Sequence, residues 1–414
     1  MKSIASCTVR IFVMHRKTLN SMMEKFKLAA ELDTSVSLSD RVGTLYKACQ
    51  TLAGFSRSWC PIEKLEAISV PPPEGVTAGS EEHNQLTRAV LRADDIASAL
   101  SKQIDGINTG LDLSQLVNLY WCLAILGRYE ENMVRTVQRR VHELLNPGVT
   151  IENVCKLLFS ESTFFHRESS INISFDEETF AGLSLPVQAN LLQSLALMRK
   201  DVEMALRLKK ILLSNTMSMI KQNLDIDKEV IPYVARVCLF VGALVGQDNH
   251  HDVSRLRSAL SPSRLPAWKY SFELCLACHA VATKGVELNP FIENVFPTDT
   301  LYIPPKGKKK LIVELVRPNS VVWTINGDDV TVYGVDCYTR LTRLTLAYLG
   351  YRIVAITLTE WLKLRGDKAR QVSYVKRRIR NCLRQRRLFS GTERDVLRSG
   401  SELSEESSDS DMSY

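Results

Sequence analysis

Hydrophobic residues recur at steps of three and four along most of the first 300 positions, which is typical of helices with one buried face. The clearest example is the series Leu113, Leu116, Leu119, Leu123 and Leu126. Placing residues 112–128 over 184–200 aligns Asn118 with Asn190, and a weaker copy begins near Val149. This spacing predicts an all-α, solenoid-like region of helical repeats over 37–300, in which each helix pair buries its face by stacking on its neighbours.

The pattern changes after Tyr302, where Pro304-Pro305 interrupts the helical register. Short β-branched runs predict three hairpin-connected strands at 311–316, 321–326 and 330–335, followed by a helix that Gly350 ends. A fourth strand over 351–358, a short helix carrying Trp361 and a last helix over 367–389 complete the order. The predicted fold class is therefore α plus α/β and multidomain, with a small α/β module over 306–389.

Charge is distributed unevenly along the 414 residues, whose formal net charge is +7. Residues 301–390 hold 19 basic and 6 acidic side chains, whereas 391–414 hold 2 basic and 7 acidic ones together with seven serines. A tail of that composition cannot bury a core, so 391–414 is predicted to be disordered. One hypothesis is that this acidic tail competes with an anionic ligand for the basic block.

The basic residues of the last helix fall on one side of it. Val375 and Ile379 belong to an apolar stripe, and Arg377 lies about 200° around the helix from Val375. Arginine suits phosphate oxygens, so the stripe favours nucleic acid as the partner. The predicted phosphate contacts are Lys308, Lys309, Lys310, Arg340, Arg343, Lys376, Arg377, Arg380, Arg384 and Arg387.

Two alternatives remain for this stripe: a merely solvated basic helix, and a membrane surface. Acidic residues that would form stabilising i,i+4 ion pairs are nearly absent from the helix, which disfavours the first. Membrane binding would require apolar residues flanking the arginines, and few are present. Membrane insertion is not predicted either, because Arg236 interrupts the longest apolar stretch, 230–246.

Residues of about 309–380 resemble a RAP domain, an RNA-binding module described mainly in apicomplexan parasites. The resemblance rests on the strand 311–315 followed by Pro318, the sequence Tyr348-Leu349-Gly350-Tyr351, the Glu360-Trp361 pair and the basic last helix. It implies a fold of restriction-endonuclease-like type, upstream degenerate helical repeats, and action on organellar transcripts or ribosomal RNA.

The implied fold raises the question of nuclease activity, which would need two carboxylates and a lysine around Mg²⁺. Where the family usually has Asp-Gly-Pro, this chain has Val316-Arg317-Pro318, and Ser320 replaces a histidine. Glu314 is retained and Asp328, Asp329 and Asp336 are near, but no Asp/Glu-x-Lys follows. A metal-dependent endonuclease is therefore only an alternative, and no catalytic residue, metal or cofactor is predicted.

Three aromatic residues, one Cys/His string and one polar run are further candidates for a functional site. Trp323, Tyr351 and Trp361 are candidates for stacking on bases, and each is equally a candidate core residue. The C-x-x-C-H string at 275–279 fits a haem-attachment motif, but its apolar helical setting favours core packing. The polar run 248–252 lacks the spacing of a metal site.

The first 30 residues are rich in basic and hydroxyl side chains and contain no acid before Glu24, a composition typical of an organellar transit peptide. Together these features predict a non-catalytic RNA-binding protein of the mitochondrion, with the plastid as the alternative. Its roles would be RNA processing, stability, translation or ribosomal RNA assembly, with mitoribosomal or RNA-processing proteins as further partners. A structural component of a mitochondrial ribosome is the second alternative.

Overall fold

The computed structural model describes residues 36–56 and most of 93–384. The gaps within the second range are 94, 147, 166–170, 172–175, 200, 223, 225, 227–229, 247–253, 255, 257–268, 283–284, 289, 293–294, 305–309, 317–319, 327–328 and 365. The chain divides into two compact units, one formed by 1–261 with 318–341 and the other by 262–317 with 342–414. Most of the described structure is helical, with small mixed sheets in the C-terminal half. This agrees with the predicted class of α plus α/β.

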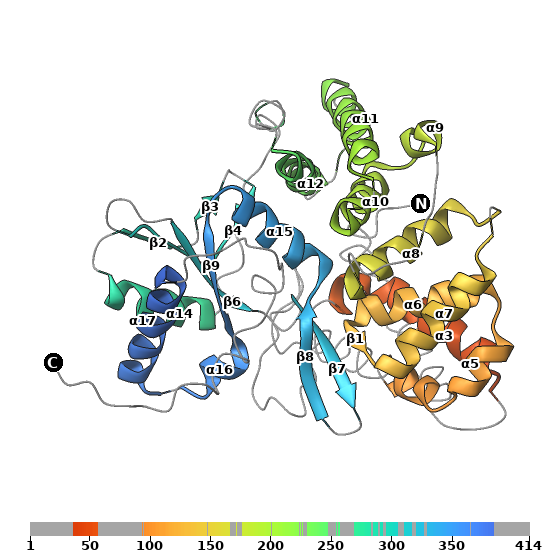
Figure 1. Ribbon diagram of the computed structural model, residues 1–414, viewed down its shortest axis with the longest axis horizontal. Coiled ribbons are helices and arrows are strands. Elements are labelled where there is room, and N and C mark those ends of the chain that lie inside the picture. Colours follow the sequence, from red (N-terminus) through yellow and green to blue (C-terminus); the bar gives the residue numbers. More distant parts are fainter. Residues whose placement is uncertain are drawn as a thin grey trace. The chain divides into compact units, whose positions relative to one another are not determined.

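Helices make up most of the first unit. They are α3 (Leu38–Ser56), α5 (Ile104–Gly110), α6 (Leu113–Leu126), α7 (Glu131–Leu144), α8 (Ile151–Phe164), α9 (Glu177–Ala181), α10 (Leu185–Met198), α11 (Val202–Lys221) and α12 (Val230–Leu244). Helices α3, α6, α8, α10 and α12 pack in that order, each against the next, while α7 packs on α6 and α11 on α10 and α12 (Figure 1). The apolar periodicity of the sequence thus corresponds to a row of successive buried helices.

Two asparagines of the first unit make similar contacts between helices. Asn118 of α6 accepts a hydrogen bond from Lys156 Nζ of α8 at 2.8 Å, and the aligned Asn190 of α10 accepts one from Tyr233 of α12 at 2.7 Å. In both cases the amide oxygen bonds to the next helix of the row. Two asparagines 72 positions apart therefore make similar contacts.

A small sheet in the order β1-β7-β8 completes the first unit. Strand β1 (Arg128–Tyr129) runs parallel to β7 (Val321–Asn326), which forms an antiparallel hairpin with β8 (Asp329–Val335). Gly127 ends α6 in the left-handed conformation, and its carbonyl accepts a hydrogen bond from Trp323 N at 2.7 Å. The hairpin is therefore attached directly to the end of a largely buried helix.

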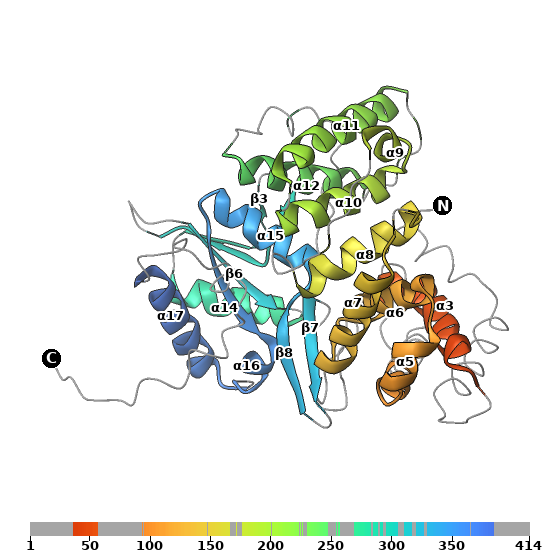
Figure 2. The same cartoon turned by 45° about the vertical axis from the view of Figure 1, so that its right-hand side comes forward.

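The second unit is built on a sheet in the order β2-β5-β6-β9. Its strands are β2 (Val286–Leu288), β5 (Thr300–Tyr302), β6 (Leu311–Val316) and β9 (Arg352–Thr357), and β6 and β9 are parallel. A separate pair joins β3 (Phe291–Ile292) to β4 (Phe296–Pro297). Helix α14 (Lys269–Val281) packs against β6 and against α17 (Lys368–Arg384), which also contacts β9 (Figure 2).

Most predicted elements of the C-terminal part are confirmed. Helix α15 (Cys337–Tyr348) follows β8, and the short helix α16 (Leu358–Leu362) begins with the expected capping box. In it Glu360 N donates to Thr357 Oγ1, and Thr357 N donates to Glu360 Oε2.

Two expectations about the strands and helices are wrong. Helices were expected to continue to about residue 300, but the described helices before that point end at Val281 and the short strands β2 to β5 follow. The strand 311–316 was expected to form hairpins with the next two, but it pairs with β5 and β9 in another sheet. Strands of two or three residues are too short to show a recognisable alternation in the sequence. Tertiary packing, rather than the local sequence, determines which strand pairs with which.

We expect Gly127→Ala to destabilise the protein. Gly127 has a φ of 61°, and a Cβ there would lie 2.9 Å from the Val321 carbonyl oxygen. The left-handed conformation costs a non-glycine residue about 1–2 kcal/mol, and the close approach adds to that cost. Urea unfolding measures the loss against Gly182→Ala, a matched control with a φ of −73° and a nearest neighbour at 3.7 Å. Equal unfolding midpoints for the two variants would contradict this account.

Candidate nucleic-acid interface

Helix α17 has one buried side and one basic side. Gln371, Val375, Ile379 and Cys382 are buried. The exposed basic residues of the helix are Lys368, Arg370, Lys376, Arg377, Arg380 and Arg384. The predicted division into an apolar and a basic side is therefore confirmed, with Cys382 more deeply buried than Leu383. We call Lys376, Arg377, Arg380 and Arg384 the basic face of α17.

No acidic residue neutralises this face within the described part of the chain. Residues 368–384 contain no Asp or Glu. Asp367 precedes the helix, and its carboxylate accepts a hydrogen bond from Arg370 N at 2.9 Å. Arg378 is the one basic side chain of α17 with an ion pair to a described residue, at 3.8 Å from Glu360. The basic face therefore carries positive charge whose field extends into solvent.

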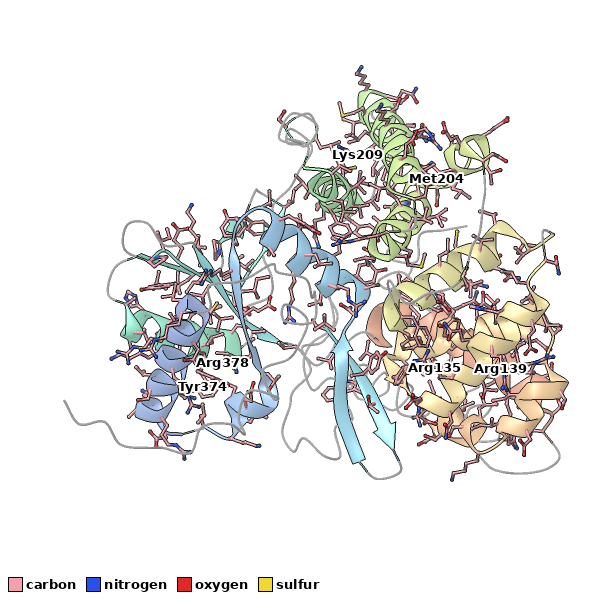
Figure 3. All side chains as sticks on the ribbon, viewed as in Figure 1. Arg135, Arg139, Met204, Lys209, Tyr374 and Arg378 are labelled. Atoms are coloured by element: carbon pink, nitrogen blue, oxygen red, sulfur yellow. The ribbon has the colours of Figure 1, made fainter. Side chains whose placement is uncertain are left out.

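Hydrogen bonds fix the position of α17 on the sheet. Arg378 Nη2 donates to the Ala355 carbonyl of β9 at 2.6 Å. Figure 3 labels Arg378 and Tyr374, which both lie on α17. Burial raises the pKa of Tyr374, so this phenol stays protonated. At the other end, Arg352 Nη1 donates to the Cys382 carbonyl at 2.5 Å, which places a positive charge at the helix C-terminus.

The prediction that Arg340 and Arg343 contact phosphate is wrong, because both side chains are buried. Arg340 donates to the carbonyl oxygens of Ser162 and Val335 at 2.7 and 2.9 Å. Arg343 forms an ion pair with Glu314 of β6. Positions of α15 opposite its leucine stripe are therefore buried as well.

The other predicted phosphate contacts divide into two groups. Lys310 is exposed. Lys308, Lys309 and Arg387 lie outside the described residues, as do the transit region 1–30 and the acidic tail.

Two of the three aromatic candidates for base stacking are core residues. Trp361 is 1% exposed, and its indole Nε1 donates to Glu273 at 3.3 Å. Trp323 is 7% exposed on the middle strand of its sheet. Tyr351 is half-buried and remains a candidate.

An exposed aromatic residue on α14 was not among the predicted site residues. Phe272 is 59% exposed, and Leu276, one turn later, is 51% exposed. On the same helix Leu274, Cys275 and Cys278 are buried. The largely apolar composition of 270–281 did not show which side of the helix faces solvent, because the packing of neighbouring elements decides that.

The exposed Lys363, Lys368 and Arg370 near the start of α17 were missed as well. The predicted arginine stripe begins at Arg377, and these residues precede it. A count of basic positions from Leu362 onward would have found them.

Glu314, the carboxylate retained from the nuclease pattern, is engaged by a protein cation. Its partner Arg343 is fully buried, so the pair compensates charge within the second unit. Asp336 caps α15 by accepting a hydrogen bond from Thr339 N at 2.7 Å. Among the described residues there is no group of three or more His, Cys, Asp or Glu side chains that could hold a metal ion.

The cysteines of the C-x-x-C-H string are part of the core. Cys275 Sγ lies 3.0 Å from Thr300 Oγ1, and burial raises the pKa of Cys278 to about 12. His279 is exposed. The polar run 248–252 lies outside the described residues.

Helices of the described ranges are all too short or too polar to cross a membrane. No protein-family model matches the chain, and a search of curated proteins found no match either.

We expect Arg343→Met to destabilise the protein by roughly 3–5 kcal/mol, because it removes one partner of a buried ion pair. Adding Glu314→Gln should recover part of the loss by removing the uncompensated charge. Urea unfolding gives the values, with Arg377→Met as the exposed control that should change stability by about 0.5 kcal/mol or less. If the Arg343 variant were as stable as the control, the ion pair would not stabilise the fold as we propose.

Proposed function

We propose that the protein binds RNA non-catalytically through the basic face of α17. The observation that carries the proposal is a helix with six exposed basic side chains, four of them in the basic face, and no acidic residue along its length. An apolar side anchors the helix, so the charges are held in place rather than distributed over a mobile segment. Arginine forks at successive turns suit the phosphates of a nucleic-acid backbone.

The proposal extends to the finer architecture. The ordered packing of α3, α6, α8, α10 and α12 supports a solenoid-like repeat region. Parallel strands β6 and β9, with α15 in the connection, support a module related to the RAP domain and to restriction-endonuclease-like folds. By that resemblance, the proposed targets are organellar transcripts or ribosomal RNA, and the proposed location is the mitochondrion, with the plastid as the alternative.

The two alternatives differ in what supports them. A structural role in a mitochondrial ribosome would use the same basic face on folded ribosomal RNA. A metal-dependent nuclease would need Glu314, and the ion pair with Arg343 gives this carboxylate a structural role instead. We therefore favour binding over cleavage.

Replacing Arg377 and Arg380 together with serine is expected to weaken RNA binding and its dependence on salt. Each phosphate contact on a single strand contributes about 0.7 to the slope of log K against log salt concentration, so the slope should fall by about 1.4. Fluorescence anisotropy with a labelled RNA at several salt concentrations measures it. The matched control replaces two exposed lysines of α11, Lys210 and Lys221, with serine. The proposal fails if the control weakens binding as much, or if the unmodified chain binds no RNA.

We expect Phe272→Ala to lower the affinity for single-stranded RNA about 5- to 100-fold and to leave the affinity for duplex RNA unchanged. Phe272 is exposed on a helix that packs against α17, and an exposed aromatic ring on a protein that binds RNA can stack on an unpaired base. Competition binding with strands of equal length tests this, with Leu276→Ala as the control for loss of exposed apolar area. An equal loss for single strand and duplex would refute stacking.

A further inference from the structure

The basic face of α17 lacks a protein partner within the described residues. Lys376, Arg377, Arg380 and Arg384 are exposed, and none forms an ion pair with a described acidic residue. Arg377 does lie over the ring of Tyr374, at 5.6 Å, but that contact leaves its charge uncompensated. Such a face attracts an anionic segment that is held near it.

The chain itself contains an anion of this kind beyond α17. Residues 402–411 include five acidic side chains, Glu402, Glu405, Glu406, Asp409 and Asp411, and no basic one. Four serines lie among them. This is the most acidic stretch of its length after the basic block. Its net charge is opposite in sign to that of α17.

The connection between the two is long enough for contact. Helix α17 ends at Arg384, and residues 385–401 connect it to the acidic stretch. Seventeen residues span at most about 60 Å, whereas a helix of 17 residues is about 25 Å long. The acidic stretch can therefore reach every turn of the basic face.

We propose that residues 402–411 dock on the basic face of α17 of the same chain and thereby compete with RNA. Single exposed ion pairs are weak, but several pairs on a short tether act at millimolar effective concentration. Only an RNA that binds the basic face more tightly than the tail does would then displace the tail. The competition with RNA rests on the proposed function, whereas the contact between tail and helix does not.

Zero-length carbodiimide cross-linking of the full chain without RNA tests the contact. This chemistry joins a lysine amine to a carboxylate with which it is in contact. At about 20 mM salt we expect cross-links from Lys376 to residues 402–411 in the monomer, and at about 1 M salt we expect their loss through screening. Arg377→Ser with Arg380→Ser should reduce them, and Lys210 of α11 should give none.

The contact is refuted if Lys376 gives no link to 402–411, if Lys210 links to them equally, or if the links occur only between two copies of the chain. A second arm measures RNA affinity after Glu402→Gln, Glu405→Gln, Glu406→Gln, Asp409→Asn and Asp411→Asn. We expect about tenfold tighter binding at low salt, and unchanged affinity would refute the competition. Cross-links without RNA binding by either protein would instead refute the proposed function and leave the contact standing.

Discussion

Burial of the apolar side of α17 is the interaction on which the proposed activity depends. Val375 and Ile379 enter the core of the second unit, and this fixes the rotation of the helix about its axis. Once that rotation is set, the helical period places Arg377, Arg380 and Arg384 in solvent. The hydrogen bonds from Arg378 to β9 and from Arg352 to the last turn hold the helix in this position. The backbone that carries the basic face is thus fixed, which would lower the entropic cost of binding a phosphate backbone.

The arginines of the C-terminal half form two groups, which differ in whether the guanidinium bonds to oxygen atoms of the protein. Arg340, Arg343 and Arg378 bond to carbonyl or carboxylate oxygens and stabilise the fold. Those of the basic face have no such acceptor among the described residues. A guanidinium buried without compensation would cost several kcal/mol, so each buried arginine needs its oxygen partners, whereas water solvates the exposed ones. Net charge alone does not separate these two groups.

Sequence patterns predicted the strongly periodic elements well. Helices α6, α10 and α17 and strands β6, β7, β8 and β9 were expected close to their observed positions, because caps and periodicity act locally. The pairing of β6 with β5 and β9 was not predictable, since it depends on residues far apart in sequence. The same holds for the burial of Arg343 and the exposure of Phe272, which depend on residues far from them in sequence.

The central claim is that RNA contacts the basic face of α17. Ultraviolet cross-linking of the full chain to RNA, followed by mass spectrometry of the linked peptides, locates the contact directly. We predict linked peptides from residues 366–384 and from the neighbouring α14. Linked peptides confined to the helices of the first unit, or no linked peptide at all, would contradict the claim.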